Sequence, residues 1–516
     1  MKKISAILLT LALVLSMSLS MMLTASAETP SVWDGKANIK WYVDAGKGAG
    51  LYELNTAQDL AGFAYLVCAG NANGPYSGVY YDSQYNVLGL KASGKESQYA
   101  VADRLYEPVS GDGSQEIAGD MFFDQMVNLT SDIVLNEGDA STWATTAPAN
   151  KGWLPIGGER ANAATGSGFD GIFDGKGHTV SGLYYAGADD HLGAGLFGYV
   201  GRDSNAIIQN ITVENFYVKG GLSVGGIVGH ARRGVNLENC YAKNGSVTAV
   251  DTQAGGLVGG AFSVASAKYC GVENVNINTL NRSAGFFGAI NNLTLEVTDS
   301  YVIGSKIKMT GSDAGVIVGL CNNSSIKVTN VYSTLAIEVV PATPAEGEEA
   351  PEQRVGLVFA GGGSSGSAPS ATVSGFYYVD SIGDTATGKD TEGVSAVELD
   401  AIKGENAKTA LLGFDFDTVW VTVADGTPKL DLNRAPVGGG DEGGDEGDGG
   451  DVGSSDSSNK TDDTTAKPDD TTAKADDTTE EAKEEKKGCG SSIGMASVAL
   501  IAVACGALAI SKKKEN

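Results

Sequence analysis

The sequence predicts an all-β protein whose central part is a right-handed parallel β-helix. Four related Gly-x-x-Gly segments begin at Gly195, Gly226, Gly256 and Gly285, at intervals of 31, 30 and 29 residues. Short alternating runs of β-branched and aromatic residues follow most of these segments. A unit of about 30 residues cannot bury an apolar face alone, so we expect identical units to stack with about 4.8 Å between coils. A β-propeller blade would need about 40 to 50 residues.

The repeat continues, less regularly, beyond these four segments. A fifth segment carries Val316 in place of the first glycine, and a sixth begins after a Pro- and Glu-rich insert at 341–353. We expect the repeat glycines either to turn corners with positive φ or to let neighbouring coils approach closely. These glycines are Gly195, Gly198, Gly226, Gly229, Gly256, Gly259, Gly285, Gly288, Gly319 and Gly356.

The N-terminal residues predict export. Lys2 and Lys3 precede an apolar run, and the small residues at 25–27 provide a signal peptidase site. We therefore expect a cleaved signal peptide at 1–27, with the mature protein beginning at Glu28.

Residues 28–152 are expected to form an N-terminal cap and the first coils. Thr56 can cap a helix that has Asp59 at its third position and an apolar stripe behind it. Such a helix would protect the open edge of the first coil. Residues 73–120 match no pattern and are expected to form a surface elaboration.

The β-helix is expected to occupy 153–380, followed by a C-terminal cap at 381–433 and an acidic linker at 434–488. Within the linker, residues 441–487 hold 17 acidic and 6 basic side chains and almost no apolar ones. Its seven-residue repeat lacks the apolar seam of a coiled coil, so we expect a disordered, self-repelling stalk.

The C-terminus predicts a membrane anchor. Residues 489–510 carry no charge, and a helix of 22 residues spans about 33 Å, enough for a bilayer core. Lysines in the tail at 511–516 are expected to stay in the cytoplasm. We therefore expect a single-pass type I protein of the cell membrane with its body outside. Attachment by sortase is a lesser alternative, because no Leu-Pro-x-Thr-Gly precedes the helix.

Composition excludes several classes of function. The net charge of −27 comes from 36 basic and 63 acidic residues, without the basic clusters that nucleic-acid binding needs. Only three histidines occur, and no His-Glu-x-x-His motif is present, so neither a metal centre nor another cofactor is expected. Cys240 and Cys270 could bridge neighbouring coils, but a role as small buried residues is favoured.

These segments give the chain a resemblance to a known family. The repeat resembles the GLUG motif, a glycine-rich unit of secreted and surface-bound bacterial proteins, including adhesin-like proteins and non-catalytic parts of some immunoglobulin A peptidases. The segments 153–157 and 169–180 resemble the usual lead into such repeats, and 413–420 resembles their finish. The resemblance spans about 50–433. It implies an exported repeat architecture and supplies no catalytic residues.

A catalytic site is the weaker reading of the remaining polar motifs. Asp170, Asp174 and His178, with Lys176 between them, form the best acid–base candidate for a polysaccharide lyase or hydrolase. Asp-Gly and Lys-Gly pairs are also typical of tight turns, and that structural role is favoured. We therefore expect no catalytic residues.

Binding is the favoured class of function. Exposed aromatic rings on a β-helix can stack on sugars or pack on proteins. We expect an adhesin-like surface protein that binds extracellular glycans or cell-surface proteins. A polysaccharide-active enzyme and a passive surface-structural protein are the alternatives. Tyr241, Tyr301 and Tyr332 recur at a similar place in their repeats and are expected to form a stacked ladder. Spacing leaves open whether this ladder faces the core, which is favoured, or forms a platform. The platform candidates are Tyr217, Tyr241, Tyr301 and Tyr332.

Overall fold

The computed structural model describes most of the first of the two units into which the chain divides, Met1–Gly438 and Gly439–Asn516. The predicted signal peptide, acidic linker, membrane span and tail lie outside the described residues. Within the described part, no helix is long and apolar enough to cross a bilayer. The described residues are 30–71, 73–93, 114–150, 152–157, 166–187, 193–341, 352–362, 368–379 and 386–432.

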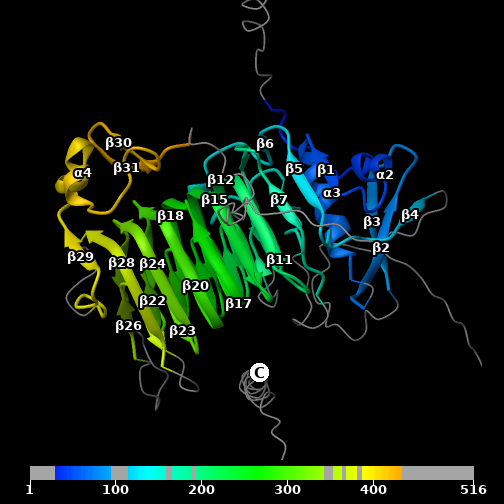
Figure 1. Cartoon of the computed structure of the whole chain (residues 1–516). Helices are drawn as coiled ribbons and strands as arrows, with labels where there is room; N and C mark the ends of the chain where they lie inside the picture. Colours follow the sequence, from blue (N-terminus) through cyan, green and yellow to red (C-terminus); the bar gives the residue numbers. More distant parts are fainter. Residues whose placement is uncertain are drawn as a thin grey trace, which may run out of the picture. The chain divides into compact units, whose positions relative to one another are not determined.

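The central part is a parallel β-solenoid with one coil per sequence repeat (Figure 1). One short strand from each coil joins a six-stranded parallel sheet, which gives five steps from coil to coil. Ser223 pairs with Gln253, Gln253 with Arg282, and Arg282 with Asp313, so the register advances by 30, 29 and 31 residues. The predicted repeat and its parallel stacking are confirmed. The short strands are β10 (Gly193–Ala194), β13 (Ser223–Gly225), β16 (Gln253–Gly255), β19 (Arg282–Ala284), β22 (Asp313–Gly315) and β26 (Arg354–Gly356).

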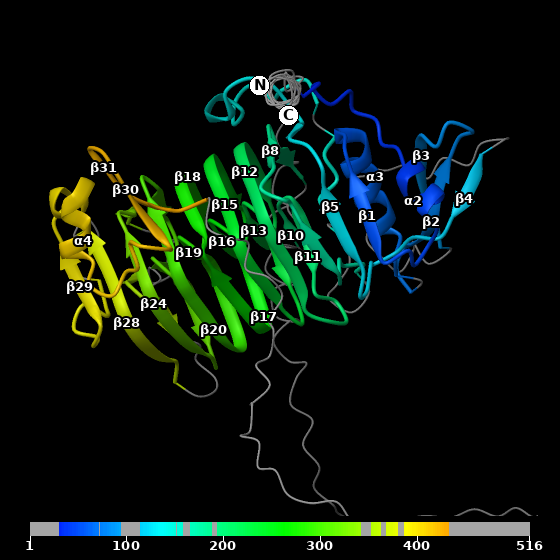
Figure 2. The same ribbon diagram turned by 45° about the horizontal axis from the view of Figure 1, so that its top comes forward.

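The other strands of the coils, with the parallel strands before and after them, form a 20-stranded sheet whose members lie side by side along the stack (Figure 2). A typical coil continues from β13 through β14 to the long, bent strand β15. The sheet contains β1 (Leu51–Leu54), β5 (Met126–Leu129), β6 (Ile133–Val134), β7 (Ile172–Asp174), β8 (Thr179–Ser181), β9 (Tyr184–Ala186), β11 (Phe197–Val200), β12 (Ala206–Gly220), β14 (Val228–Ala231), β15 (Val235–Ala249), β17 (Val258–Lys268), β18 (Gly271–Thr279), β20 (Phe287–Ile303), β21 (Lys306–Met309), β23 (Val318–Asn322), β24 (Ser325–Ser333), β25 (Ala336–Val339), β27 (Phe359–Gly362), β28 (Ser370–Val379) and β29 (Val394–Val397).

The repeat glycines allow the two sheets to approach each other. A Cβ atom added at Gly229 would lie 2.2 Å from the backbone nitrogen of Ala194, and one at Gly259 would lie 2.4 Å from that of Val224. None of the ten repeat glycines has a positive φ. Close approach is therefore their role, and the alternative expectation that they turn corners was wrong.

Asparagine turns two corners of the coil instead. Asn210, Asn239 and Asn330 have φ of 54°, 55° and 51° at equivalent places in three coils. Asparagine tolerates this left-handed conformation because its short polar side chain can bond locally. The Asn239 Nδ2 donates to Asn210 Oδ1 at 2.9 Å, so the amides also link successive coils. The second corner repeats the arrangement with Asn215, Asn244 and Asn274.

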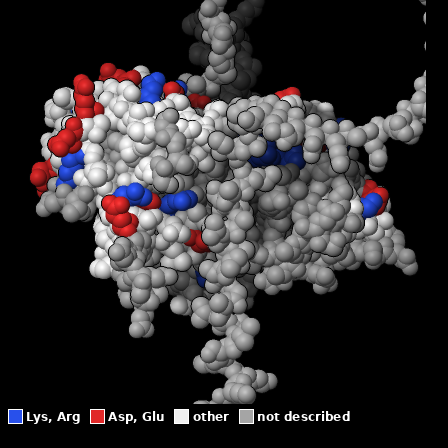
Figure 3. Space-filling view, turned by 90° about the horizontal axis from the view of Figure 1, so that it is seen from below, with Lys and Arg blue, Asp and Glu red and all other residues white. Residues whose placement is uncertain are grey.

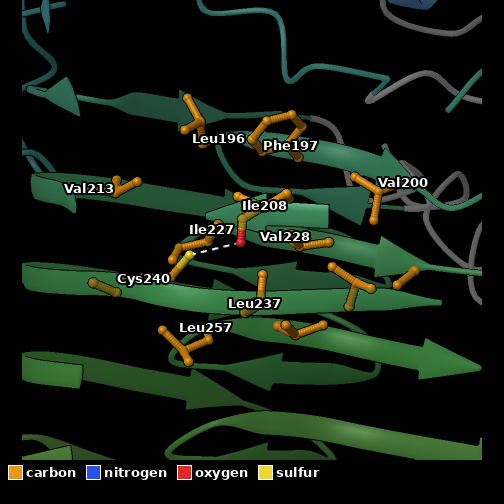
Figure 4. Packing of buried hydrophobic residues seen from close by; sticks show 14 of the residues in the cluster. Leu196, Phe197, Val200, Ile208, Val213, Ile227, Val228, Leu237, Cys240 and Leu257 are labelled. Carbon is orange, nitrogen blue, oxygen red and sulfur yellow. Dashed lines mark hydrogen bonds between the residues drawn. The ribbon is translucent and has the colours of Figure 1, made fainter. Parts of the chain in front are cut away.

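The core of the solenoid is apolar and continuous from coil to coil (Figure 4). Cys240 is fully buried in it, and its thiol donates to the Ile208 carbonyl at 3.2 Å. The four described cysteines are all free and buried, so the Cys240–Cys270 bridge is not formed. Burial raises the pKa of the Cys240 thiol well above its ordinary value. The favoured role of small buried residues is confirmed for these cysteines.

The N-terminal residues add helices and a small sheet. Helix α3 (Ala57–Cys68) begins at the predicted cap, where Thr56 Oγ1 accepts from the Asp59 amide at 3.1 Å and the Asp59 carboxylate accepts from the Thr56 amide at 3.0 Å. Phe63 packs edge-on against Phe169, with 5.4 Å between ring centroids. The region from 73 to 120 contributes a three-stranded antiparallel sheet. The further elements here are α2 (Lys40–Ala45), β2 (Tyr76–Tyr81), β3 (Val87–Ala92), β4 (Gln115–Ile117) and the 3₁₀ turn η2 (Ala140–Thr142).

Residues 399–430, here called the C-terminal segment, follow the last coil. Its hairpin and short helices pack their apolar side chains against outward-facing tyrosines of the solenoid rather than into its core. The sequence suggested only a cover for the end of the stack. The elements of the segment are η3 (Leu399–Ile402), η4 (Gly404–Asn406), α4 (Ala407–Ala410), β30 (Trp420–Val423) and β31 (Gly426–Leu430).

Candidate functional site

The acid–base candidates do not form a common site. The carboxylate of Asp170 accepts from the backbone amides of Arg202 and Asp203 at 2.5 and 3.1 Å, and burial raises its pKa to about 6. His178 bonds instead to Asp132, with 3.1 Å between Nδ1 and Oδ1. Asp170 therefore stabilises the turn at 202–203, whereas His178 contacts Asp132 elsewhere on the coils.

Asp174 has a structural role of its own. Its carboxylate accepts from the Lys176 amide at 2.8 Å, from Gln209 Nε2 at 2.9 Å and from Asn210 Nδ2 at 3.0 Å. Burial would raise its pKa, but these hydrogen bonds and the Lys176 ammonium hold the pKa below its ordinary value. Asp174 accepts the first hydrogen bond in the row of asparagines that continues through Asn210 and Asn239. Its carboxylate is therefore not available as a general acid.

Three of the four predicted platform tyrosines form a ladder. The ring centroids of Tyr241 and Tyr301 lie 6.5 Å apart, and those of Tyr301 and Tyr332 lie 5.8 Å apart. Gly271 is paired between Tyr241 and Tyr301, and a Cβ there would meet both rings at less than 3 Å. The missing side chain is what lets the two rings meet across a coil.

This ladder is not an open platform, because the C-terminal segment covers it. Trp420 lies 5.8 Å from Tyr332 and 4.8 Å from Phe414, ring centroid to ring centroid. The Tyr332 hydroxyl donates to the Pro428 carbonyl. Tyr301 and Tyr332 are 1 % and 0 % exposed, so neither ring can stack on a ligand in this state. The three tyrosines are therefore buried, as was favoured, but in a cluster with the C-terminal segment and not in the interior of the coils.

An ionic contact fastens the segment beside the ladder. Lys429 Nζ lies 2.5 Å from Glu273 Oε2, and the Tyr301 hydroxyl donates to Glu273 Oε1 at 2.5 Å. Burial would raise the pKa of Glu273, but these hydrogen bonds and the charge of Lys243 lower it. Glu273 is therefore a charged anchor for the cover.

The fourth tyrosine, Tyr217, lies on a different outer face. Its ring stacks on Tyr184 with 5.6 Å between centroids and 17° between planes, and Trp143 packs edge-on against Tyr184 at 6.1 Å. The loop around η2 approaches from the side, held by Asn215, whose Oδ1 accepts from the Ala140 amide at 2.9 Å. The Tyr217 ring is thereby fixed in orientation, and the residue is 9% exposed.

Tyr217 lines a pocket of about 240 Å³ between this loop and three successive coils. Its walls are mostly neutral and polar, and Asp139 is the one charged residue among them. That carboxylate is engaged in capping η2 through the Ser141 amide at 2.9 Å. We call this cavity the Tyr217 pocket. It is lined by Asp139, Ala140, Ser141, Ala144, Asn215, Tyr217, Asn244, Gly245, Ser246, Asn274 and Asn276.

Three neutral polar groups in the Tyr217 pocket are in register on neighbouring strands. Tyr217 pairs with Ser246, and Ser246 pairs with Asn276. The Tyr217 hydroxyl, the Ser246 hydroxyl and the Asn276 amide have no hydrogen-bond partner among the described residues. Neighbouring parallel strands lie about 4.8 Å apart, so these groups form a short row beside a fixed aromatic ring. Such a row can bind the hydroxyls of a sugar while the ring contacts its apolar face.

A second cavity, of about 540 Å³, lies at another corner of the coils. Its walls hold hydroxyl and amide groups, such as Asn292, Thr294 and Asn323, and no aromatic ring. Several of these groups bond one another, as Thr294 Oγ1 does with Ser325 Oγ at 2.9 Å. The described residues contain no group of three or more His, Cys, Asp or Glu placed to hold a metal ion.

The sequence singled out Tyr217 and missed Ser246 and Asn276. Ser246 lies one repeat after Tyr217 and Asn276 lies two repeats after it, at the same position of the coil. The spacing of the repeats could therefore have identified both residues. The pocket wall at 139–144 could not be found in this way, since it comes from outside the repeats.

Comparison with known proteins gives distant similarities. No family model matches the chain. Halomucin of Haloquadratum walsbyi is 34% identical over 165 residues, which are 32% of this chain; the match covers 2% of halomucin, so the chain spans a small part of that relative's length. A solved structure of a Bacteroides ovatus protein, provisionally assigned as an immunoglobulin A1 protease, has 16% identity and a TM-score of 0.40 over 59% of this chain and 85% of that one.

Proposed function

We propose that the chain is a non-catalytic, exported binding protein that displays its β-solenoid at the cell surface and recognises glycans at the Tyr217 pocket. The signal peptide, acidic stalk and C-terminal span expected from the sequence support the display, and the resemblance to GLUG-motif proteins agrees with it. Adhesion to glycan-bearing surfaces is the role that follows.

One observation carries this proposal: a fixed Tyr217 ring stands beside neutral groups on Ser246 and Asn276 that have no hydrogen-bond partner among the described residues, in register on three coils. Sugar recognition combines an apolar ring contact with several hydrogen bonds. Glycoside hydrolysis would instead need paired carboxylates facing one cavity. The two described cavities offer Asp139 alone, and it is engaged with Ser141.

The test is binding of the full-length protein to an array of immobilised glycans. Tyr217→Ala should abolish binding, and Ser246→Ala should weaken it while leaving the ring contact. Tyr80→Ala, on a half-buried tyrosine of β2 away from the solenoid face, is the matched control. Thermal unfolding of each variant separates loss of binding from loss of fold. Failure of the wild-type protein to bind any glycan would refute the proposal.

Surface display is tested separately. Cells that produce the protein are treated with external protease, and the body should be cleaved without lysis. Protection of the body until the cells are lysed would contradict an extracellular location.

A further inference from the structure

We propose that the glycan bound at the Tyr217 pocket is acidic, and that it extends from the pocket along the neighbouring strands onto three lysines. This inference rests on the proposed function and names the ligand class of the same site. The geometry points to a carboxylated or sulfated polysaccharide, with its neutral part at Tyr217 and its anionic groups at Lys306 and Lys308.

The row that begins at Tyr217 leads directly to a lysine. Asn276 of β18 pairs with Lys306 of β21, so Tyr217, Ser246, Asn276 and Lys306 occupy one outward row on four successive coils. Strands about 4.8 Å apart place Lys306 about 14 Å from Tyr217, a distance that a short oligosaccharide covers.

A second outward row runs parallel to the first, two residues further along each strand. It contains Lys219, Thr248, Asn278 and Lys308, paired in that order. Lys306 and Lys308 are about 7 Å apart along their strand, because alternate residues share one face. We call the surface made by these two rows the lysine face.

Among the described residues, the lysines of this face form no ion pair within 4 Å. They are Lys219, Lys306 and Lys308, of which Lys306 and Lys308 are exposed. The next residue of the second row, Glu338, is exposed at the far end of the face and forms no ion pair with Lys308 closer than 4 Å. Elsewhere exposed lysines do pair, as Lys327 does with Glu296 at 3.4 Å and Lys408 with Glu405 at 2.7 Å.

The lysine face is unusual in a chain of net charge −27. Acidic side chains gather at the end of the body that carries α4 and β29, while much of the described surface seen from below has few charges (Figure 3). A local excess of cations on an acidic protein attracts anionic groups and repels cationic ones, so it contributes selectivity toward an acidic ligand. The neutral hydroxyl and amide groups between Tyr217 and Lys306 supply hydrogen bonds along the same path.

The test compares polymers that share a backbone and differ in charge. Full-length protein is titrated with dextran sulfate and dextran, and with polygalacturonate and its methyl ester. Measurements at an ionic strength of about 0.1 M, where charges act over about 10 Å and more distant acidic groups are screened, are repeated at about 1 M, where they act over about 3 Å. At low salt a charged polymer should bind at least tenfold more tightly than its neutral partner, and the difference should disappear at high salt.

Two double variants separate the lysine face from general charge. Lys306→Gln with Lys308→Gln should weaken binding of the charged polymer about tenfold, or about 1.4 kcal/mol shared by two lysines. Lys36→Gln with Lys327→Gln removes the same charge from exposed side chains, 73% and 58% accessible, on other elements. This control should bind as the wild type does. All four substitutions are at the surface, so unfolding temperatures should hardly change.

The outcomes distinguish the two proposals. Equal binding of charged and neutral polymers, or equal weakening by both double variants, would overturn the acidic-ligand inference while leaving glycan binding in place. Absence of binding to all four polymers, together with an empty glycan array, would refute the proposed function itself. Preference for dextran sulfate or for polygalacturonate supports the inference and identifies the anionic group as sulfate or carboxylate.

Discussion

Replacing Gly259 by alanine tests whether close approach of two sheets holds the solenoid together. The new Cβ would lie 2.4 Å from the Val224 nitrogen, 2.6 Å from the Gly229 carbonyl oxygen and 2.7 Å from the Ser223 carbonyl carbon. All three are backbone atoms, so no side chain can rotate away. Restoring van der Waals contact requires the sheets to separate by about 1 Å. Overpacking of this kind costs about 1–3 kcal/mol, and weakened backbone hydrogen bonds add about 1 kcal/mol each.

The expected result is a local loss of about 3 kcal/mol in the coils next to residue 259. Hydrogen exchange followed by mass spectrometry suits a repeat protein, since its coils need not unfold together. A loss of 3 kcal/mol accelerates exchange in 223–260 about a hundredfold. Gly152→Ala is the control, because a Cβ at this glycine meets nothing within 4 Å. Equal exchange rates in both variants and the wild type would refute the role assigned to the repeat glycines.

Three further predictions follow from the packing and the ionisable groups. Trp420→Ala should cost about 3–5 kcal/mol and release the C-terminal segment, seen as faster proteolysis within 399–430; unchanged cleavage would contradict the cover. Asn210→Val should destabilise by about 2–3 kcal/mol and Asn210→Gly by less, since φ is 54° there; equal unfolding temperatures would count against the asparagine corner. Burial and the nearby Arg232 lower the pKa of His230 to about 4. The neutral side chain therefore contributes to the free energy of unfolding above pH 6.5, and this contribution is lost as the pH falls toward 4. His230→Phe should remove up to about 3 kcal/mol of that acid destabilisation in urea titrations at pH 7 and 4; parallel pH dependence of the variant and wild type would contradict it.

The sequence predicts the features that repeat or that depend on a few neighbouring residues. The coil length follows from the spacing of glycine segments such as those at Gly226 and Gly256, because parallel stacking forces each coil onto the same register. The start of α3 follows from Thr56 and Asp59, because a capping box is a contact over three residues. These local signals need no knowledge of how distant parts of the chain pack.

The assignment of roles within the repeat was less successful, for a physical reason. Glycine permits both positive φ and close approach, so the spacing alone left two roles open for Gly229 or Gly259. Asparagine recurs at one place in several repeats, as at Asn210 and Asn239, and its tolerance of the left-handed region identifies the corner. Asparagine was therefore a more informative signal than glycine, because at this place it indicates only a corner with positive φ.

The candidate site shows where prediction from sequence ends. Tyr217 and Tyr332 look alike in the sequence, since both lie in the strand-forming part of a repeat. Trp420 and Pro428 cover Tyr332, whereas a loop near Asp139 stands beside Tyr217 and leaves a pocket. Both neighbours are about 75 to 100 residues away in the chain and outside the repeat, so no periodic signal specifies them.

The two tyrosine sites together suggest why one face of the solenoid is covered and another is open. A row of stacked rings such as Tyr301 and Tyr332 exposes apolar surface with few polar groups, and such a patch on a parallel sheet would promote association. The C-terminal segment buries it and pairs its Lys429 with Glu273 beside the rings. The lysine face beyond Tyr217 needs no such cover, because Ser246, Asn276 and the lysines are well hydrated when unbound. An open polar row beside one oriented ring is therefore a surface that the protein can keep exposed and still use for binding.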